Sequence, residues 1–440
     1  MNIAFQKMEY IYYFKIYNTS QFKSISFRHK FGFTKEMKRN KLEKKKIAII
    51  GTVGVPANYG GFETLAEHLI EDLGQHHELT VYCSGKKYPK EQRKAQYKAA
   101  NLKYLPLDAN GIQSIFYDSI SILHALFYAD VLLILGVAGA WLLPFVRLFT
   151  NKKIIISIDG IEWKRDKWNL VAKWYLFWAE SLAVKYSHID ISDNEAIQDY
   201  TAARYGTLSR IIEYGADHTL NIPLTKEALI KYPFLIGTYA FKVCRIEPEN
   251  NVHLILEAFS MTENLPLVFV GNWDKSEYGK SLKEKYKNQK NIHILDPIYD
   301  QKQLDTLRSN ASLYVHGHSA GGTNPSLVEA MYLGLPILAY GVSYNRVTTE
   351  NKAMYFNDSN DLIKQLQTIH ASKLQQIGQE MKSIAHRRYT WSHIAKKYQL
   401  LLDEVNAMRD KSSVNAKVSK LPYHELLGRG LAHLKTTNTF

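Results

Sequence analysis

Short apolar runs alternate with helical patterns along most of this 440-residue chain, and the alternation starts twice. The first series predicts strands at 46–51, 78–83, 102–107, 131–135, 153–158, 189–192 and 210–214. The second series predicts strands at 235–245, 267–271, 293–295, 312–316 and 336–340. Helical patterns lie between several of these runs, and such alternation is typical of a doubly wound parallel sheet. The sequence therefore predicts an α/β fold with two Rossmann-like domains facing each other across a cleft.

A polar stretch between the two series sets the expected domain boundary. We expect an N-terminal domain over 46–225 and a C-terminal domain over 226–390. A final amphipathic pattern predicts a helix over 391–405. Residues 1–45 and 406–440 are expected to be basic extensions, the first of which could be disordered.

Positive charge is concentrated in these extensions. Of the net charge of +14, residues 1–46 supply 12 Lys and Arg against 3 acidic residues, and residues 405–440 supply 6 against 2. The body between them is near neutral, which argues against a nucleic-acid partner, because such a protein carries its basic stripe on the folded body. Basic ends fit an anionic membrane surface, or they are simply solvated. Cys83 and Cys244 lie in apolar runs and are expected to be buried thiols in a reducing cytosol. We therefore expect a cytoplasmic protein, peripheral on the inner face of the plasma membrane.

One segment, VLLILGVAGAWLLPFVRLF at 131–149, is nearly long enough to span a bilayer. Gly136, Gly139, Pro144 and Arg147 interrupt it. A buried strand, a glycine turn and a short apolar helix explain it better, and the next predicted strand follows at βαβ spacing. A helix that dips into the membrane surface is a second interpretation.

Two glycine-rich segments each follow a predicted strand and open a predicted helix. The first is GTVGVPANYGGFE at 51–63, which ends in Gly60 and Gly61. Glycine lets the backbone approach a ligand closely, and the helix N-terminus offers free N–H groups to an anion. A tight strand–helix turn without a ligand is the alternative.

The second segment is HGHSAGGTNPSLVEAM at 316–331. Its candidate donor-binding residues are Gly322, Thr323, Asn324, Ser326 and Glu329. Helix capping alone would explain Asn324 or Ser326 but not the whole run. Glu329, expected in the first turn of the helix, could accept hydrogen bonds from two adjacent sugar hydroxyls. We expect His318 to face the cleft rather than to bind a metal.

Two further strand ends carry charge. Arg245, in RIEPENN at 245–251, offers a five-donor fork for phosphate, or else forms a surface salt bridge. Asp159, in SIDGIEWKRDKW at 157–168, stands where a strand meets glycine, a usual place for a catalytic carboxylate. Asp159 could instead bind the acceptor or be structural. Glu162 is expected at the cleft, although Glu162, Arg165 and Asp166 could form a local charge network.

Taken in their order along the chain, the four segments resemble the family-4-type glycosyltransferases of the GT-B fold. They are most similar to the subgroup that includes rhamnosyltransferases for bacterial capsule, O-antigen and cell-wall polysaccharides. The resemblance covers about 46–404. It implies a nucleotide-sugar donor held mainly by the second domain, an acceptor held mainly by the first, and a final helix that crosses back to the first domain.

Three positions depart from the wider family pattern. Gly321 stands where the first of two glutamates is usual, Asn250 stands in place of a lysine, and Asp159 stands where many members have histidine. All three departures resemble the rhamnosyltransferase-containing subgroup. They imply transfer of L-rhamnose from dTDP-L-rhamnose to a lipid-linked saccharide. A UDP-hexose or UDP-N-acetylhexosamine donor is the alternative, and a sugar-nucleotide epimerase is a more distant one.

The chemistry follows from the charge that develops in such a reaction. Arg245 and backbone N–H groups near Gly61 and Thr323 would stabilise the leaving nucleoside diphosphate. Glu329 would orient the sugar, with Asn250 also near the donor, and Asp159 could deprotonate the acceptor hydroxyl. The chain contains no Asp-x-Asp and no metal-ligand spacing, so we expect neither a metal nor a cofactor.

Overall fold

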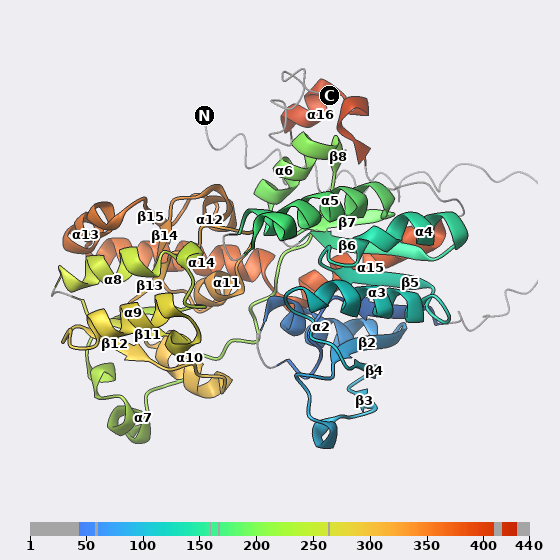
Figure 1. The fold of residues 1–440 in the computed structure, drawn as a ribbon. Helices are drawn as coiled ribbons and strands as arrows, with labels where there is room; N and C mark the ends of the chain where they lie inside the picture. Colours follow the sequence, from blue (N-terminus) through green and yellow to red (C-terminus); the bar gives the residue numbers. More distant parts are fainter. Residues whose placement is uncertain are drawn as a thin grey trace, which may run out of the picture. The chain divides into compact units, whose positions relative to one another are not determined.

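The computed structural model describes residues 44–57, 60–158, 160–165, 168–262, 265–408 and 416–428. Asp159 and most of the two basic extensions lie outside the described residues. Residues 44–440 form one compact unit that contains two large sheets (Figure 1). The α/β fold with parallel sheets is therefore confirmed, while the domain boundary at 225/226 stays a prediction.

The first sheet has the strand order β3-β4-β2-β1-β5-β6-β7-β9. Its bounds are β1 Lys46–Ile50, β2 Glu78–Ser84, β3 Gln96–Tyr97, β4 Ala100–Leu105, β5 Val131–Leu135, β6 Lys153–Ile158, β7 Ile189–Ser192 and β9 Arg210–Ile211. All pairs are parallel except β3 with β4. Every residue of β5 is buried, as its uninterrupted apolar sequence predicts for a strand covered on both faces. Strand β1 lies between β2 and β5 and pairs with both. The strand order of the sheet therefore reverses at β1, and ligands bind at such switch points.

Helices cover this sheet: α2 Gly61–Leu73, α3 Gln113–Ala125, α4 Leu143–Phe149, α5 Leu170–Tyr186 and α6 Glu195–Tyr205. The apolar segment at 131–149 forms β5, a 3-10 turn at Ala140–Leu142 and then α4. This matches the expected strand, turn and short helix. Among the described helices none is both long and apolar enough to cross a membrane.

The second sheet is entirely parallel, with the order β12-β11-β10-β13-β14-β15. Its strands are β10 Ala240–Val243, β11 Leu267–Val270, β12 Ile292–Leu295, β13 Leu313–His316, β14 Ile337–Tyr340 and β15 Met354–Phe356. Its helices include α8 Val252–Ser260, α10 Gln301–Ser309, α11 Pro325–Tyr332, α12 Ser343–Thr348 and α14 Ala371–Arg388. The strand expected at 235–245 is shorter because Pro233–Ile236 forms a 3-10 turn. Strand β10 lies between β11 and β13, so the segments after β10 and β13 emerge at neighbouring positions.

The last long helix, α15 Trp391–Ala407, packs against α2 of the first sheet. The ring of Trp391 stacks on His68, with 4.2 Å between the centroids, and Arg210 of β9 pairs with Glu404 at 2.7 Å. The chain therefore returns from the second sheet to the first.

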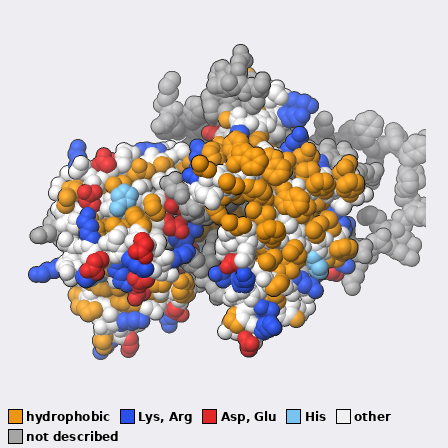
Figure 2. All heavy atoms as spheres, viewed as in Figure 1, with side chains coloured by type: hydrophobic (Ala, Val, Ile, Leu, Met, Phe, Trp, Pro, Cys, Tyr) orange, Lys and Arg blue, Asp and Glu red, His pale blue; other side chains and the backbone are white. Residues whose placement is uncertain are grey.

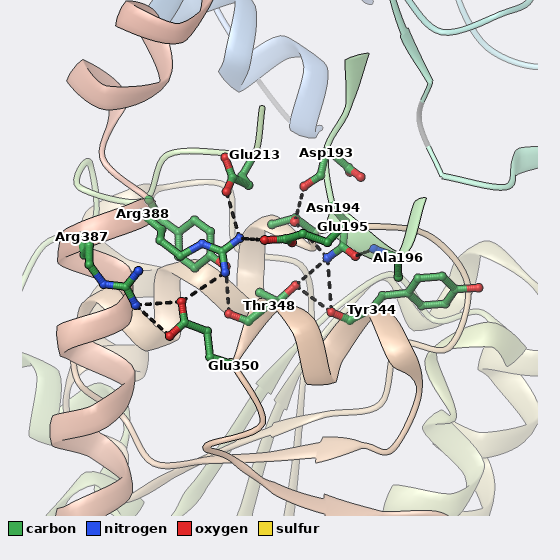
Figure 3. Close-up of polar contacts among 12 residues, drawn as sticks. Asp193, Asn194, Glu195, Ala196, Glu213, Tyr344, Thr348, Glu350, Arg387 and Arg388 are labelled. Atoms are coloured by element: carbon green, nitrogen blue, oxygen red, sulfur yellow. Dashed lines mark hydrogen bonds and ion pairs between the residues drawn. The ribbon is translucent and has the colours of Figure 1, made fainter. Parts of the chain in front are cut away.

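A partly buried ionic cluster forms at this return point (Figure 3). Arg388, at the end of α14, pairs with Glu195 of α6, with Glu213 at 3.0 Å and with Glu350 at 3.2 Å. Lys397 of α15 also pairs with Glu213, at 2.5 Å. Burial works to raise the pKa of Glu213, but Lys397 and Arg388 outweigh it and leave the pKa below its usual value. The cluster therefore ties α6, which packs on the first sheet, to α14, which packs on the second.

Candidate active site

All four sequence segments lie at the carboxyl ends of central strands, β1 and β6 in one sheet and β10 and β13 in the other. The glycines show how closely they meet. A Cβ added to Gly61 would lie 3.3 Å from Cγ of Pro325, at the start of α11. A Cβ added to Gly160 would lie 2.7 Å from Cα of Gly321. The 316–331 segment therefore meets the 51–63 segment at the helix N-termini and the 157–168 segment at the loops, and its His318 also contacts Asn250 of the 245–251 segment.

The loop after β1 is held by the helix that it opens. Oε1 of Glu63 accepts hydrogen bonds from the Val53 N–H at 2.7 Å and from the Thr52 hydroxyl at 3.3 Å. Gly60 has φ +135°, and a Cβ there would lie 1.8 Å from Oε2 of Glu63, so only glycine fits. No side chain among the described residues caps the start of α2. The start of α2 therefore directs the positive end of its helix dipole toward this loop.

The loop after β13 explains one departure from the family pattern. Gly321 has φ +133°, and a Cβ there would lie 2.9 Å from Nε2 of His318. Gly160 packs directly against it. A glutamate at position 321 would be strained by this backbone conformation, and its Cβ would press on the His318 ring, so this chain favours glycine there.

The next two residues contact the first sheet. A Cβ on Gly322 would lie 1.8 Å from Oδ1 of Asp193, and the Thr323 hydroxyl donates to the Asp193 carbonyl at 2.5 Å. The Asn194 amide donates to Thr348 at 3.0 Å and to the Tyr344 carbonyl at 3.3 Å, both near α12 (Figure 3). The side chain of Thr323 is thus a link between the two sheets, while the predicted donor contact of its N–H stays a prediction.

Asn324 and Ser326 cap α11. Oδ1 of Asn324 accepts from the Ser326 N–H at 3.1 Å and from its hydroxyl at 2.8 Å. The Ser326 oxygen in turn accepts from the Tyr314 hydroxyl at 2.9 Å. The capping alternative describes the arrangement of these two side chains.

Glu329 lies in the second turn of α11, not in the first as the sequence suggested, because the helix begins at Pro325. Oε2 pairs with Arg308 at 2.7 Å, and Oε1 lies 3.3 Å from Nε2 of His218. Burial works to raise the pKa of Glu329, but Arg308 and His218 lower it overall. Glu329 is therefore an ionised carboxylate that is already held by two protein groups.

Arg245 differs from the other arginines near these segments. Arg308 is buried between Asp305 and Glu329, and Arg165 is held by three carboxylates, whereas the Arg245 side chain is 39% exposed. Nε of Arg245 lies 3.9 Å from Oε2 of Glu247. The surface salt bridge considered above is thus present but long, the guanidinium remains accessible, and its contact with a donor phosphate stays a prediction.

Asn250 and His318 form a buried pair behind Arg245. The Asn250 amide donates to the Arg245 carbonyl at 2.8 Å, which directs its Oδ1 toward Nδ1 of His318, 3.0 Å away. We therefore assign the His318 proton to Nδ1, which leaves Nε2 as an acceptor. Desolvation, with Arg165 and Arg245 nearby, lowers the pKa of His318 to about 3, so the ring is neutral at pH 7. Asn250 is buried and positions His318, while its predicted place at the donor stays a prediction.

Glu162 belongs to an ionic network that joins the two sheets. Arg165 pairs with Glu162 at 2.9 Å and, beyond the local network considered above, with Glu249 at 3.1 Å and Glu247 at 3.4 Å. The indole N–H of Trp168 donates to the other oxygen of Glu162 at 3.0 Å. The segment after β6 is thereby tied to the segment after β10.

Sequence reasoning missed several groups at this site. Asp193 and Asn194 directly follow β7, and the same strand-end rule that selected Asp159 could have found them. Arg308 and His218 carry no such signal, because one lies within a helix and the other in a polar stretch.

Two family models match the chain. Residues 44–217 match a domain of unknown function (DUF1972), and residues 237–376 match "Glycosyl transferases group 1". No curated protein matches this chain.

Solved structures match over most of the chain. Sucrose-phosphate synthase from Thermosynechococcus elongatus is 16% identical with a TM-score of 0.70, covering 83% of this chain and 100% of its own. HepE from Anabaena, solved with UDP-glucose, is 14% identical with a TM-score of 0.64, covering 82% and 99%. A glycosyltransferase from Rickettsia africae is 14% identical with a TM-score of 0.64, covering 83% and 99%. The chain therefore has the GT-B fold, and its second sheet lies within a glycosyl transferases group 1 domain.

Proposed function

We propose that this protein is a glycosyltransferase that moves a sugar from a nucleotide-sugar donor to a saccharide acceptor. One observation carries the proposal: the N-termini of α2 and α11 meet at Gly61 and Pro325, on the same side of the sheets as the accessible guanidinium of Arg245. Helix N-termini and a guanidinium all stabilise negative charge, which develops on the diphosphate as it leaves the sugar.

The similar structures support a nucleotide-sugar donor. HepE was solved with UDP and with UDP-glucose, and the group 1 model covers the segments that contain Arg245 and the β13–α11 loop. In this proposal Arg245 and the positive dipole ends of α2 and α11 neutralise the leaving group, because the Ser326 N–H at the start of α11 is already bound by Asn324. The Nε2 acceptor of His318, next to Gly321, is placed to receive a hydrogen bond from a sugar hydroxyl.

The proposed donor is dTDP-L-rhamnose, on the resemblance described above. Two of the three departures that carry this resemblance belong to one structural unit. Asn250 binds Nδ1 of His318, and Gly321 lies beside Nε2 of the same ring. The departures therefore act together on one neutral imidazole, which supports a shared function for them. A UDP-hexose or UDP-N-acetylhexosamine donor is the second candidate, favoured by the HepE complexes.

The acceptor hydroxyl must lose a proton as the new bond forms, and we assign this proton to Asp159. The support is sequence position: Asp159 follows β6 directly, and the next residue, Gly160, packs on Gly321. The proposed acceptor is a saccharide carried on a membrane lipid.

Release of nucleoside diphosphate tests the proposal. Purified protein is incubated with dTDP-rhamnose, UDP-glucose and UDP-N-acetylglucosamine, with and without lipid-linked saccharide. We expect acceptor-dependent release with dTDP-rhamnose. Preference for a UDP-sugar would overturn the donor but keep the class, and no release from any donor would overturn the class.

The variant Asp159→Asn tests the base. We expect unchanged donor affinity with transfer slowed roughly 10²–10⁴-fold, because an amide cannot take the proton. The matched control is Asp296→Asn, an exposed carboxylate with no place in the site. Equal transfer by Asp159→Asn and the control would remove Asp159 from catalysis.

A further inference from the structure

A broad apolar surface covers the outer side of α3, α4 and α5 (Figure 2). Of the 23 large hydrophobic side chains exposed among the described residues, 14 fall between 112 and 178. They include Phe116 and Phe127 at α3, Phe145 and Phe149 of α4, and Leu170 and Trp174 of α5, with Phe127 88% and Leu170 85% exposed. We call this surface the α3–α5 face. Folded monomers rarely expose so large a contiguous apolar patch without a partner for it.

The fold does not need these outward side chains. Each helix packs on its own sheet through other residues, for example Tyr117 and Ile122 of α3 and Leu143 and Val146 of α4. The three helices are therefore apolar on the inside and on the outside. Exposing these outer side chains to water costs free energy unless another surface covers them.

The charges around the α3–α5 face favour a lipid bilayer as its partner. Its helices carry two acidic side chains, Asp118 and Glu180, and both are buried. Lys164 is exposed beside Trp163, whose ring packs on Phe177 of the face. A second copy of this chain would bring another Lys164, and no exposed carboxylate of these helices, to the rim, whereas anionic lipid headgroups would attract Lys164. Aromatic and aliphatic side chains with a cationic rim are typical of surfaces that lie in a membrane interface.

The inner sides of the same helices touch the candidate active site. The Tyr117 hydroxyl of α3 donates to the Thr52 carbonyl in the loop after β1, at 3.0 Å. Helix α5 begins five residues after Arg165, which holds Glu249 beside β10. The α3–α5 face and the site are thus built on opposite sides of shared elements.

We propose that the α3–α5 face is a membrane-docking surface whose apolar side chains enter the interfacial layer of an anionic bilayer. Docking would hold the site within reach of a saccharide carried on a lipid, so this inference rests on the proposed function. It differs from the expectation for the basic ends, whose attraction to lipid is electrostatic and is screened by salt.

Sedimentation with vesicles of equal phosphatidylcholine and phosphatidylglycerol tests the inference, using the full chain. We expect the wild type to bind at low salt and to stay bound at about 1 M salt, where exposed charges are screened within about 3 Å. Phe116→Glu, Phe149→Glu and Trp174→Glu should each weaken binding about tenfold, and the triple variant at least about 100-fold.

The matched control changes three exposed apolar residues elsewhere to glutamate: Ile230, Ile236 and Met261. It alters net charge equally and should bind like the wild type. Three results would overturn the proposal: release of the wild type at high salt, equal losses in the two triple variants, or a wild-type dimer in light scattering that the face variant dissociates.

A parallel assay separates this inference from the proposed function. Transfer to a water-soluble saccharide should be the same in the wild type and the triple variant. Docking without any transfer would overturn the proposed function but not the membrane-docking surface. Transfer without docking would overturn the membrane-docking surface but not the proposed function.

Discussion

Arg245 is the side chain on which the proposed chemistry depends most. Its guanidinium is accessible, whereas Arg165 and Arg308 are occupied by carboxylates. We predict that Arg245→Ala lowers turnover by about 2–4 kcal/mol of transition-state stabilisation, as the loss of one positioned donor does. The thermal midpoint should not change, because within the described part of the chain the ion pair of this side chain is a long one, to Glu247. Steady-state kinetics and calorimetry check both parts, and wild-type turnover would contradict the role.

Helix α3 carries an unusual internal charge, Asp118, whose Oδ1 is buried without a hydrogen-bond partner. Burial raises its pKa to about 8, against 3.8 when exposed. Between these values the folded state holds a proton that the unfolded state has lost, so stability falls as pH rises, by up to about 1.4 kcal/mol per pH unit. Asp118→Asn removes this dependence and should be more stable than the wild type at pH 8. Urea unfolding at pH 6 and pH 8 measures the difference, and an unchanged slope with pH would contradict the assignment.

The two sheets of the molecule are joined by the ionic cluster around Arg388. Glu213 binds both Arg388 and Lys397, and its pKa is lowered overall despite burial. Glu213→Gln should therefore destabilise the protein by roughly 3 kcal/mol at pH 7. Because the pKa of Glu213 is lower in the folded state, its stabilisation of the fold is fully present above the unfolded pKa of 4.5. This stabilisation is lost as the pH falls through the folded-state pKa of Glu213. The difference between variant and wild type should shrink below pH 4.5 in denaturant unfolding, and a difference independent of pH would argue against ion pairing. Exposed Glu277→Gln is the control.

The sequence by itself determined the structural features that depend on residues close together along the chain. Apolar runs such as 131–135 specify strands because a strand buried on both faces needs an unbroken apolar sequence. Gly60 and Gly321 mark positions that only glycine can occupy, and Arg245 stands where parallel strands deliver ligand-binding groups. These features gave the α/β fold and four of the segments that meet at the site.

Only the tertiary structure decided which distant groups are paired. Arg165 and Glu249 are 84 residues apart, and Glu329 is held by His218 and Arg308 from two other segments. Periodicity along a helix or strand does not predict such partners, because the order of the strands and the packing of the layers determine which distant residues meet. The same reason applies to the α3–α5 face. The sequence offers a membrane-surface helix within 131–149 as one interpretation, but only the placement of three helices on one side of the sheet shows that their apolar side chains point outward together.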